Sequence, residues 1–515
     1  MDRIGCIRAR AWFAVLIIGT LSSQASADKP DSKASVTVGA PAAAAPASAT
    51  KKGGQPGTNA QSDMRTPAQE KYGLPVTPQV GGPVDTDLSK PLSLQRAIRI
   101  GLLRQNSIAI AQTQADAAQG RLTQARSSFF PQVTPTYQFQ TNLSPGGSIL
   151  INGQRIGGSS SSETQSSVIA ARQLIFDTGK REANVGAARR GAFGAEYGVG
   201  NQRQDVVLSI TTAYFNLLRD RELVRVQQES VKRAEETSRA IEAEFQAGTA
   251  AKSDTLQSQA DLANARVALL SAENDYRIQE ATLKNAMGVV TSMPLILDDS
   301  PIPAPETTPD PIPLDRYVKT AYVNRLDVKE QQERVYSQGY NVRVAKINSG
   351  LTVQADVTEG YAIEPTSGEE RTFIVSASYP LFDAGNSRAV VRENKAQWEA
   401  EKRNLDQLEQ NVRLNVDQSY SAKEQSKQRQ IGAKLAVAAA DENYKAALAK
   451  NKEGLINILE LINAEVLLIN AQVQQVQAIY DYHVAAAQLL RDTGLNDTIF
   501  IPRVPGARAP IPPRP

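Results

Sequence analysis

The chain has little of the chemistry that most enzymes use, because its 515 residues include one cysteine, Cys6, and one histidine, His483. A disulfide needs two cysteines, and structural zinc sites need clusters of cysteine and histidine. No glycine loop of the phosphate-binding kind occurs. His483 lies within a long stretch of helix-forming residues, so we interpret it as a packed helical side chain. The sequence therefore predicts no disulfide, no metal, no cofactor and no enzymatic activity.

A large excess of charge of one sign is also missing, and aromatic residues are scarce. The chain has 57 Lys and Arg residues against 54 Asp and Glu residues, and 5% of its residues are aromatic. Nucleic-acid-binding proteins concentrate basic residues on one face, and single-strand binders stack bases on aromatic side chains. We therefore expect no nucleic acid as a partner.

Long apolar runs are missing after residue 27, where no stretch approaches the length of a membrane-spanning helix. The N-terminus predicts a secretory signal peptide over residues 1–27, with a basic start, an apolar run from Ala11 to Leu21 and a small-residue cleavage site at Ala25-Ser26-Ala27. An uncleaved anchor helix is the alternative, but the run is short for a span. Cys6 precedes the apolar run, so an N-terminal lipid anchor is not expected.

Three segments have the composition of disordered chain. Residues 28–88 are rich in Ala, Pro, Gly, Ser and Thr, residues 294–313 contain seven prolines, and residues 498–515 are again rich in proline. Such segments bury too little apolar surface to offset the entropy lost on folding. We expect a disordered leader, a linker and a disordered tail, in that order.

The sequence between these segments is duplicated. A shift of 206 positions places residues 176–179, Phe-Asp-Thr-Gly, on residues 382–385, Phe-Asp-Ala-Gly. The same shift places Gly248 on Gly454 without a gap. An internal repeat of this kind indicates two copies of one structural unit. We therefore expect a first repeat over residues 89–293 and a second over residues 314–497.

Proline is absent between Gly146 and Met293 and between Leu381 and Ile501, which permits very long helices. The first copy predicts a helix from Gly179 to Ala247, about 100 Å long at 1.5 Å per residue, and a return helix from Gly248 to Met287. The second copy repeats this plan from Gly385 to Asn451 and from Leu455 to Asp492.

The return helix of the second copy also predicts a coiled-coil seam, because its large apolar residues are alternately four and three positions apart. These residues are Leu455, Leu459, Ile462, Val466, Ile469, Val473, Val476 and Tyr480. Their counterparts in the first copy are smaller and include Leu256, Ala260, Ala263, Val267 and Leu270.

Each copy further predicts one β-hairpin. Alternation of apolar and polar residues predicts strands over residues 133–140, 168–176, 351–358 and 373–381, with loops over residues 144–166 and 364–371. A helix from Ser93 to about Phe129 precedes the first hairpin. Four strands leave two unpaired edges, and open edges are not tolerated in the hydrocarbon layer of a membrane. If the strands cross an outer membrane, several chains must close one barrel, with the first loop facing outside.

The motifs at these repeat positions resemble the TolC-like outer membrane efflux protein family. They are the strand-to-helix motifs over residues 174–179 and 380–385 and the helix-turn segments over residues 245–254 and 454–460. The resemblance covers about residues 90–495. It implies a mainly α protein with a membrane β-barrel, in which a long coiled-coil tunnel (an α-barrel) continues a trimeric 12-stranded barrel of four strands per protomer.

The same resemblance implies a function. It predicts an outer-membrane channel that serves as the exit duct of a tripartite efflux or type I secretion system and conducts substrates passively. The expected partners are two further copies in a homotrimer, a periplasmic adaptor (membrane fusion protein), an inner-membrane pump and outer-membrane lipid. The helical part would lie in the periplasm of a Gram-negative-type bacterium.

The resemblance also implies that the turns at Gly248 and Gly454 form the periplasmic tip, where such channels are gated. In the family, acidic residues that narrow the entrance stand six and nine positions after the second of these glycines. Here the two positions hold Glu460 and Asn463, and the corresponding acid of the first copy is Asp254. An acidic ring with one carboxylate per chain from the second copy is therefore expected.

Two further positions depart from the family pattern. The tyrosine and the arginine that latch the closed channel in the family are replaced here by Asn451 and Ile456. The latch chemistry is therefore not carried over to this chain. The alternative interpretation of Asp254 and Glu460 is that they are surface acids near a helix start, where the helix dipole favours negative charge.

The junctions between strands and helices are expected at Pro131, Asp177, Gly179, Pro380, Asp383 and Gly385. Each aspartate stands two residues before a glycine, where a side-chain oxygen can cap the new helix. We interpret these residues as structural.

Two other classes of protein fit part of the pattern. A secreted or periplasmic coiled-coil structural protein without a pore would have the helices, but it would be extracted without detergent. A periplasmic adaptor also has long helical hairpins, but one hairpin per chain inserted into small β-domains. The tandem repeat with two hairpin pairs favours the channel.

Overall fold

The computed structural model describes residues 91–144, 149–151, 154–156, 160–290, 294–298, 312–364 and 368–496. The predicted signal peptide over residues 1–27, the leader over residues 28–88 and the tail over residues 498–515 lie outside the described residues, as does most of the linker.

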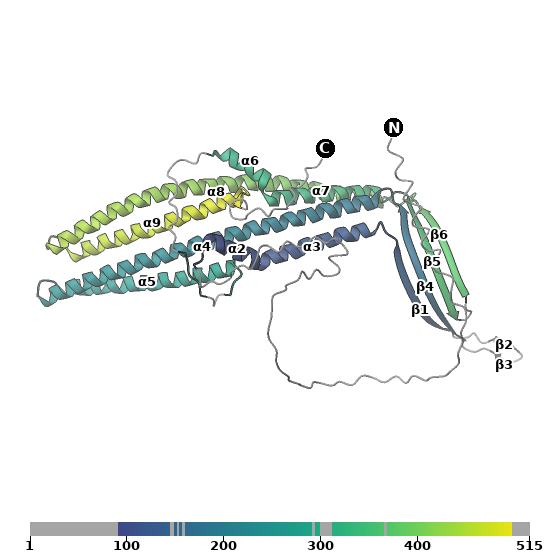
Figure 1. The fold of residues 1–515 in the computed structure, drawn as a ribbon, viewed down its shortest axis with the longest axis horizontal. Coiled ribbons are helices and arrows are strands. Elements are labelled where there is room, and N and C mark those ends of the chain that lie inside the picture. Colours follow the sequence, from purple (N-terminus) through teal and green to yellow (C-terminus); the bar gives the residue numbers. More distant parts are fainter. Residues whose placement is uncertain are drawn as a thin grey trace, which may run out of the picture. The chain divides into compact units, whose positions relative to one another are not determined.

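Two long helical hairpins dominate the described chain (Figure 1). Helix α4 (Lys180–Gln246) pairs with α5 (Lys252–Ala286), and α8 (Asn386–Lys452) pairs with α9 (Ile458–Asp492). α4 also packs against α9, so contacts between these two helices join the hairpins. None of the helices in the described ranges combines the length and the apolar composition needed to span a bilayer.

The elements of the two copies correspond at two different offsets. α4 and α5 recur as α8 and α9 at an offset of 206, so that Lys180 becomes Asn386 and Ala286 becomes Asp492. The elements before them recur at an offset of 220. These are α2 (Leu94–Arg104) with α6 (Leu314–Asn324), α3 (Asn106–Ser127) with α7 (Leu326–Ile347), and β1 (Gln132–Ser144) with β5 (Thr352–Glu364). The two offsets differ because the first hairpin has a longer connection, which contains β2 (Ile149–Ile151) and β3 (Gln154–Ile156).

The single helix predicted from Ser93 to Phe129 is wrong, because the chain bends at Gln105. This residue has extended dihedral angles, φ −70° and ψ 117°, and separates α2 from α3. Its side-chain amide donates to the backbone oxygens of Asn285 (3.3 Å) and Ala286 (3.1 Å) at the end of α5. The last carbonyl groups of a helix have no hydrogen-bond donor inside the helix, and the Gln105 side chain at the bend supplies the missing donor for α5.

The second copy has the same arrangement with different chemistry. Arg325 bends the chain between α6 and α7, and its guanidinium donates to the backbone oxygen of Asp492 at the end of α9 (3.3 Å). It also lies 2.7 Å from the Asp327 carboxylate. A buried arginine thus replaces a glutamine at the position 220 residues later.

The two β-hairpins form one four-stranded antiparallel sheet with the strand order β1-β4-β5-β6 (Figure 1). In the sequence each hairpin lies between a shorter helix, α3 or α7, and a long helix, α4 or α8. β4 spans Ser160–Phe176 and β6 spans Gly368–Ser378. The register keeps apolar residues opposite one another, as where Val133 faces Ala171 and Val357 faces Phe373. Both β1 and β6 are edge strands within the chain.

The predicted strand positions are confirmed, but the predicted loops are too long. The segment predicted as a loop over residues 144–166 contains β2, β3 and the first residues of β4, and β6 begins at Gly368 inside the second predicted loop. β6 also ends at Ser378, three residues before the predicted end. These serine- and glutamate-rich ends lack apolar alternation, and they form strand because the adjacent strand pairs with their backbone.

The predicted coiled-coil stripe of α9, for which no partner helix was predicted, lies beside the stripe that packs against α8. The residues of α9 that pack against α8 are Leu461, Ala464, Leu468 and Ala471, with Ala440 and Ala447 opposite them. The predicted stripe is offset from these residues by about one position. Alanines are frequent in the contact between α8 and α9, because small residues let two helices approach closely. The pattern of large apolar residues therefore marks the neighbouring stripe of α9 and not this contact.

Part of the predicted stripe forms a second seam, which lies against α4, whereas Leu455, Leu459 and Val466 of the same stripe are exposed. Ile462 is buried in one cluster with Ile241 of α4, and Tyr480 is buried in the main core with Leu217. The counterparts in the first copy have no such cover, since Leu256, Val267 and Leu270 are 57%, 64% and 66% exposed.

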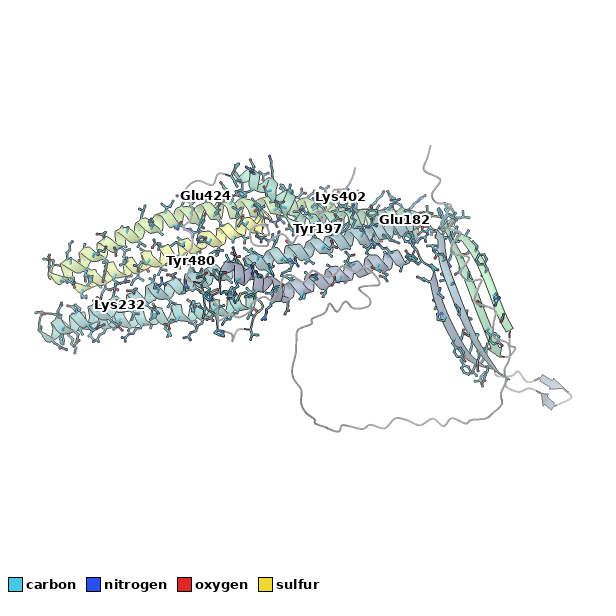
Figure 2. The ribbon with its side chains drawn as sticks, in the orientation of Figure 1. Glu182, Tyr197, Lys232, Lys402, Glu424 and Tyr480 are labelled. Carbon is cyan, nitrogen blue, oxygen red and sulfur yellow. The ribbon has the colours of Figure 1, made fainter. Side chains whose placement is uncertain are left out.

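The main core lies where α2, α4, α5 and α9 meet, at the level of Tyr480 (Figure 2). Its fully buried members include Ile98, Ile210, Leu217, Leu283 and Met287. The Tyr214 hydroxyl donates to the backbone oxygen of Leu92 (3.1 Å), which ties the start of the described chain to this core.

Candidate functional site

Two tight turns close the helical hairpins at the predicted tip. Gly248 and Gly454 have φ angles of +80° and +72°, in the left-handed region that favours glycine. The backbone amide of Gly248 donates to Phe245 (2.9 Å), and that of Gly454 donates to Asn451 (2.9 Å). Both copies therefore reverse direction by the same C-terminal helix cap.

The acidic residues predicted for the entrance lie just after these turns. Glu460 occupies the first turn of α9 and is exposed, and Asn463 is exposed one helical turn later. Asp254 occupies the first turn of α5, half-buried, and accepts a hydrogen bond from the Ser253 hydroxyl (3.2 Å). Within the single chain the exposed carboxylate of Glu460 is open to a ligand or a neighbouring subunit.

The two positions that depart from the family pattern touch each other. The Asn451 side chain donates to the backbone oxygen of Ile456 across the turn (3.3 Å). This bond stays within one hairpin and does not join α8 to another helix pair.

A buried ion pair near the tip was missed by sequence reasoning. Arg233 Nε on α4 lies 3.3 Å from Glu465 Oε1 on α9, and the Glu465 side chain is 3% exposed. Burial raises the pKa of Glu465, the Arg233 charge opposes that rise, and the Asp261 carboxylate on α5 adds to it. The available signal was a glutamate inside an apolar stripe, between Leu461 and Leu468.

The strand-to-helix junctions carry the aspartates that the sequence singled out. Asp177 is buried, and its carboxylate accepts from the backbone amides of Gly179 (3.3 Å) and Arg181 (2.8 Å). Asp383 accepts in the same way from Gly385 (3.0 Å) and Ser387 (2.8 Å).

The prolines and glycines at these junctions lie where strands and helices meet. Pro131 immediately precedes β1, and Pro380 follows β6 by two residues. Gly179 and Gly385 precede α4 and α8 with φ angles of +90° and +87°.

One face of the sheet is polar and carries an ion pair. Arg172 Nε on β4 lies 2.8 Å from Asp356 Oδ1 on β5, directly opposite it. The Gln354 amide donates to both oxygens of the same carboxylate (3.0 and 2.8 Å). The other face carries exposed apolar side chains, including Tyr137, Phe139 and Val375. The separation is not complete, because Arg371 and Glu359 form an ion pair (3.1 Å) on this second face and exposed Ile374 lies opposite Asp356 on the first.

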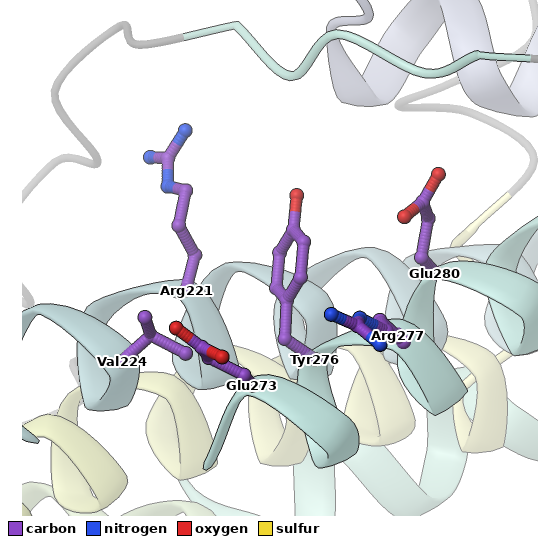
Figure 3. Close-up of a pocket in the computed structure, with 6 residues that line it drawn as sticks. All are labelled: Arg221, Val224, Glu273, Tyr276, Arg277 and Glu280. Carbon is purple, nitrogen blue, oxygen red and sulfur yellow. The ribbon is translucent and has the colours of Figure 1, made fainter. Parts of the chain in front are cut away.

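A shallow pocket of about 360 Å³ lies between α4 and α5 (Figure 3). Its lining residues are Arg221, Val224, Glu273, Tyr276, Arg277 and Glu280. Burial raises the pKa of Tyr276, with a further rise from Glu280. The two arginines and two glutamates give the lining no net charge.

His483, the candidate for catalysis or metal binding that the sequence offered, is packed against an aromatic ring. His483 is stacked on Phe215, with 5.0 Å between the ring centroids, and burial lowers its pKa. Among the described residues no cluster of three or more His, Cys, Asp or Glu side chains could hold a metal ion.

A strand sheet with one apolar and one polar face, continued by two long coiled-coil hairpins of repeated design, defines a class of channel proteins. In this class a β-barrel is joined to an α-helical barrel. The chain belongs to the family described as "Outer membrane efflux protein", whose profile matches residues 98–289 and 317–495. The predicted family is therefore confirmed.

Curated relatives carry the same description. The chain is 24% identical over 375 residues to the outer membrane efflux protein BepC of Brucella suis biovar 1, covering 72% of this chain and 78% of the relative. It is 24% identical over 405 residues to the outer membrane protein TolC of Vibrio cholerae, covering 74% and 86% respectively.

Solved structures share the fold. The outer-membrane channel OprN superposes with a TM-score of 0.67 at 18% identity, covering 78% of this chain and 89% of that one. The outer membrane channel CmeC of Campylobacter jejuni gives a TM-score of 0.66 at 17% identity, covering 78% and 86%. The predicted fold, an α-barrel joined to a membrane β-barrel with four strands per protomer, is confirmed. The chain is an outer-membrane efflux channel, and members of its family are channels.

Proposed function

We propose that three copies of this chain form the exit duct of a tripartite export complex and conduct substrates passively, without catalysing a reaction. The observation that carries this proposal is the pair of unpaired sheet edges, β1 and β6. Backbone groups at such edges have no partner in hydrocarbon, so the edges must pair with neighbouring chains. The polar face with Arg172 and Asp356 then lines the lumen.

The helices support the same assembly. In the second copy Ile462 and Tyr480 of the outer stripe of α9 are buried in clusters with α4, whereas in the first copy Leu256, Val267 and Leu270 of the equivalent stripe of α5 are exposed. α8 is the counterpart of α4 at the 206 offset. We therefore place Leu256, Val267 and Leu270 of α5 against α8 of the adjacent protomer. The first copy of one protomer then contacts the second copy of its neighbour in the helical tunnel as it does in the barrel.

The turns at Gly248 and Gly454 form the periplasmic tip in this proposal, and they meet the adaptor and the inner-membrane pump. Glu460 contributes one carboxylate per chain to the entrance, Asn463 lies beside it as a neutral residue, and Asp254 provides the first-copy acid. The repeats over residues 89–293 and 314–497 are the two structural units, joined by the linker over residues 294–313.

Single-channel recording tests the duct. The protein is purified from outer membranes in detergent and inserted into a planar bilayer, where discrete conductance steps are expected. A protein that is extracted without detergent and gives no steps would be a coiled-coil scaffold without a pore.

The acidic entrance is tested in the same recordings. Glu460→Ala should raise at least tenfold the concentration of a trivalent cation needed to block current from the periplasmic side, because three carboxylates leave the entrance together. The control is Glu229→Ala, which removes an exposed carboxylate from the middle of α4. Unchanged block in the Glu460 variant would remove this residue from the entrance and leave the duct standing.

A further inference from the structure

We infer that adjacent protomers join their sheets in one defined register, in which Ser376 of β6 lies opposite Gln138 of β1 from the next copy. The occupant of each open edge is therefore a second copy of this chain. The inference rests on the proposed trimer and adds to it the residue pairs that close the barrel.

The template for this contact is the junction between β4 and β5, where the first repeat meets the second. The pairing runs without interruption from Ser166 opposite Ala362 to Leu174 opposite Gln354. It is the contact that a duplicated chain makes between consecutive repeats. In a closed ring the last strand of one protomer meets the first strand of the next, which is again a contact between consecutive repeats.

The offsets needed to transfer this register are tested inside the chain. β4 corresponds to β6 at 206 positions, because Phe176 and Asp177 match Phe382 and Asp383. β1 corresponds to β5 at 220 positions. Applied to the first hairpin, they convert the pair Gln132 and Arg172 into Thr352 and Ser378. That pair is the one observed at the start of the β5–β6 ladder. The same two offsets thus reproduce a register that the structure shows independently.

The offsets also hold away from the sheet. A Cβ on Gly288 would meet the backbone of Arg104, and a Cβ on Gly494 would meet the backbone of Asn324. Gly288 and Gly494 are 206 positions apart, while Arg104 and Asn324 are 220 apart. The end of α5 therefore contacts the end of α2 in the first copy in the same way as the end of α9 contacts the end of α6 in the second copy.

Transferring the β4–β5 ladder gives the contact between protomers. The observed pair Ala170 and Thr358 becomes Ser376 and Gln138, and the observed pair Ile169 and Glu359 becomes Val375 and Phe139. Every transferred pair from Thr372 opposite Asn142 to Ser378 opposite Thr136 falls inside β6 and β1.

The chemistry of the two faces agrees with this register. Val375 opposite Phe139 and Ala377 opposite Tyr137 place apolar side chains together on one face, and Ser376 opposite Gln138 places polar side chains together on the other. A slip of one residue would put Val375 and Ala377 opposite glutamine or threonine side chains of β1. The agreement is limited to these pairs, because the same register places Phe373 opposite Thr141 and Ile374 opposite Gln140. A slip of two residues would leave each side chain on the same face of the sheet, so the alternation of apolar and polar residues does not exclude it. The register is chosen among these possibilities by its correspondence with the β4–β5 pairing.

Disulfide cross-linking tests the register directly. Cys6 lies in the predicted signal peptide, and the chain has no other cysteine, so a Cys6→Ser background is free of native thiols. Residues directly opposite in an antiparallel pair have Cα atoms about 4.5–5.5 Å apart, within the range of a disulfide. Residues displaced by two positions are about 7–8 Å apart, beyond that range.

Two matched double variants and two displaced controls are compared after oxidation of the purified, full-length protein in detergent. The matched pairs are Ser376→Cys with Gln138→Cys and Ala377→Cys with Tyr137→Cys. The controls combine Ser376→Cys with Thr136→Cys or with Gln140→Cys. Within one chain β1 and β6 are separated by two strands, roughly 14 Å, so a cross-link must join two protomers.

The expected result is covalent trimer on a non-reducing denaturing gel from at least one matched pair, at tenfold or more above both controls. Native size and single-channel conductance are measured on each variant before oxidation. Preferential linking of a displaced pair, or no linking in a trimer that conducts, would overturn the register and leave the duct intact. A monomer without conductance in the Cys6→Ser background would overturn the duct itself and the register with it.

Discussion

Arg233 of α4 and Glu465 of α9 form an ion pair across the contact between the two helical hairpins, with 3.3 Å between Nε and Oε1. The side chains are 18% and 3% exposed, and one oxygen of Glu465 has no hydrogen-bond partner among the described residues. Removing one member of a buried pair leaves the other charge uncompensated, whereas replacing both with apolar residues can be neutral or stabilising.

Glu465→Leu should therefore destabilise the protein by about 3–5 kcal/mol, because the Arg233 guanidinium stays charged in a buried place. The double variant Arg233→Met with Glu465→Leu should recover most of this loss. The measurement is the melting temperature of the purified protein in detergent. If Glu465→Leu has the same melting temperature as the wild type, the prediction is contradicted and the ion pair is hydrated in solution.

Arg266→Ala provides the matched control. Arg266 pairs with Glu235 at 2.9 Å on the same hairpin, but its side chain is 61% exposed. Exposed pairs contribute about 0–1 kcal/mol, so this variant should melt close to the wild type.

The pH dependence of stability should contain a contribution from His483. Burial lowers its pKa in the folded protein, so the unfolded chain binds the proton first as the pH falls. The stability that neutral His483 contributes is thus present above about pH 6.5 and is lost as the pH falls through the folded value. His483→Phe should show a smaller fall in melting temperature than the wild type between pH 7 and pH 5.

The comparison with the variant isolates the histidine. Burial raises the pKa values of Glu465, Asp261 and Asp492, which stabilises the folded state on acidification. These carboxylates are the same in both proteins and cancel in the difference. Identical pH profiles would contradict the prediction.

Gly288 should tolerate alanine less well than Gly248, although both have positive φ angles. A Cβ on Gly288 would lie 2.8 Å from the backbone oxygen of Arg104, whereas a Cβ on Gly248 would meet nothing within 4 Å. Gly248→Ala should cost about 1–2 kcal/mol from the left-handed backbone alone. Gly288→Ala should lower the melting temperature at least twice as much, and equal losses would show that the backbone around Arg104 yields.

An epitope inserted between Ile151 and Gln154 should label intact cells. These residues end β2 and begin β3 in the connection between β1 and β4, at the end of the sheet opposite the helices. The same epitope inserted between Gly248 and Thr249 should be labelled only after permeabilisation. The reverse pattern would invert the topology.

Sequence reasoning placed the hairpins well because their determinants are local. The long helices were found from the absence of proline and from the glycines at Gly248 and Gly454, and the strands from alternation. The bend at Gln105 was missed, because its cause is a contact with the end of α5, 181 positions away in the chain. The partner helix of the predicted α9 seam could not be predicted for the same kind of reason, because Leu461 and Ile462 are both apolar and only packing separates their partners.

The sequence by itself determined the duplication, the helical hairpins, the two-faced strands and hence the family, since each depends on periodicity or on a residue that fixes the local backbone. Only the tertiary structure decided which stripe of α9 meets α8 and which meets α4, where Arg233 finds Glu465, and how β4 pairs with β5. The contacts of α4 with α9 and of β4 with β5 join segments that more than 100 residues of chain separate. Their free energy comes from burial and charge pairing across elements, which no local pattern specifies.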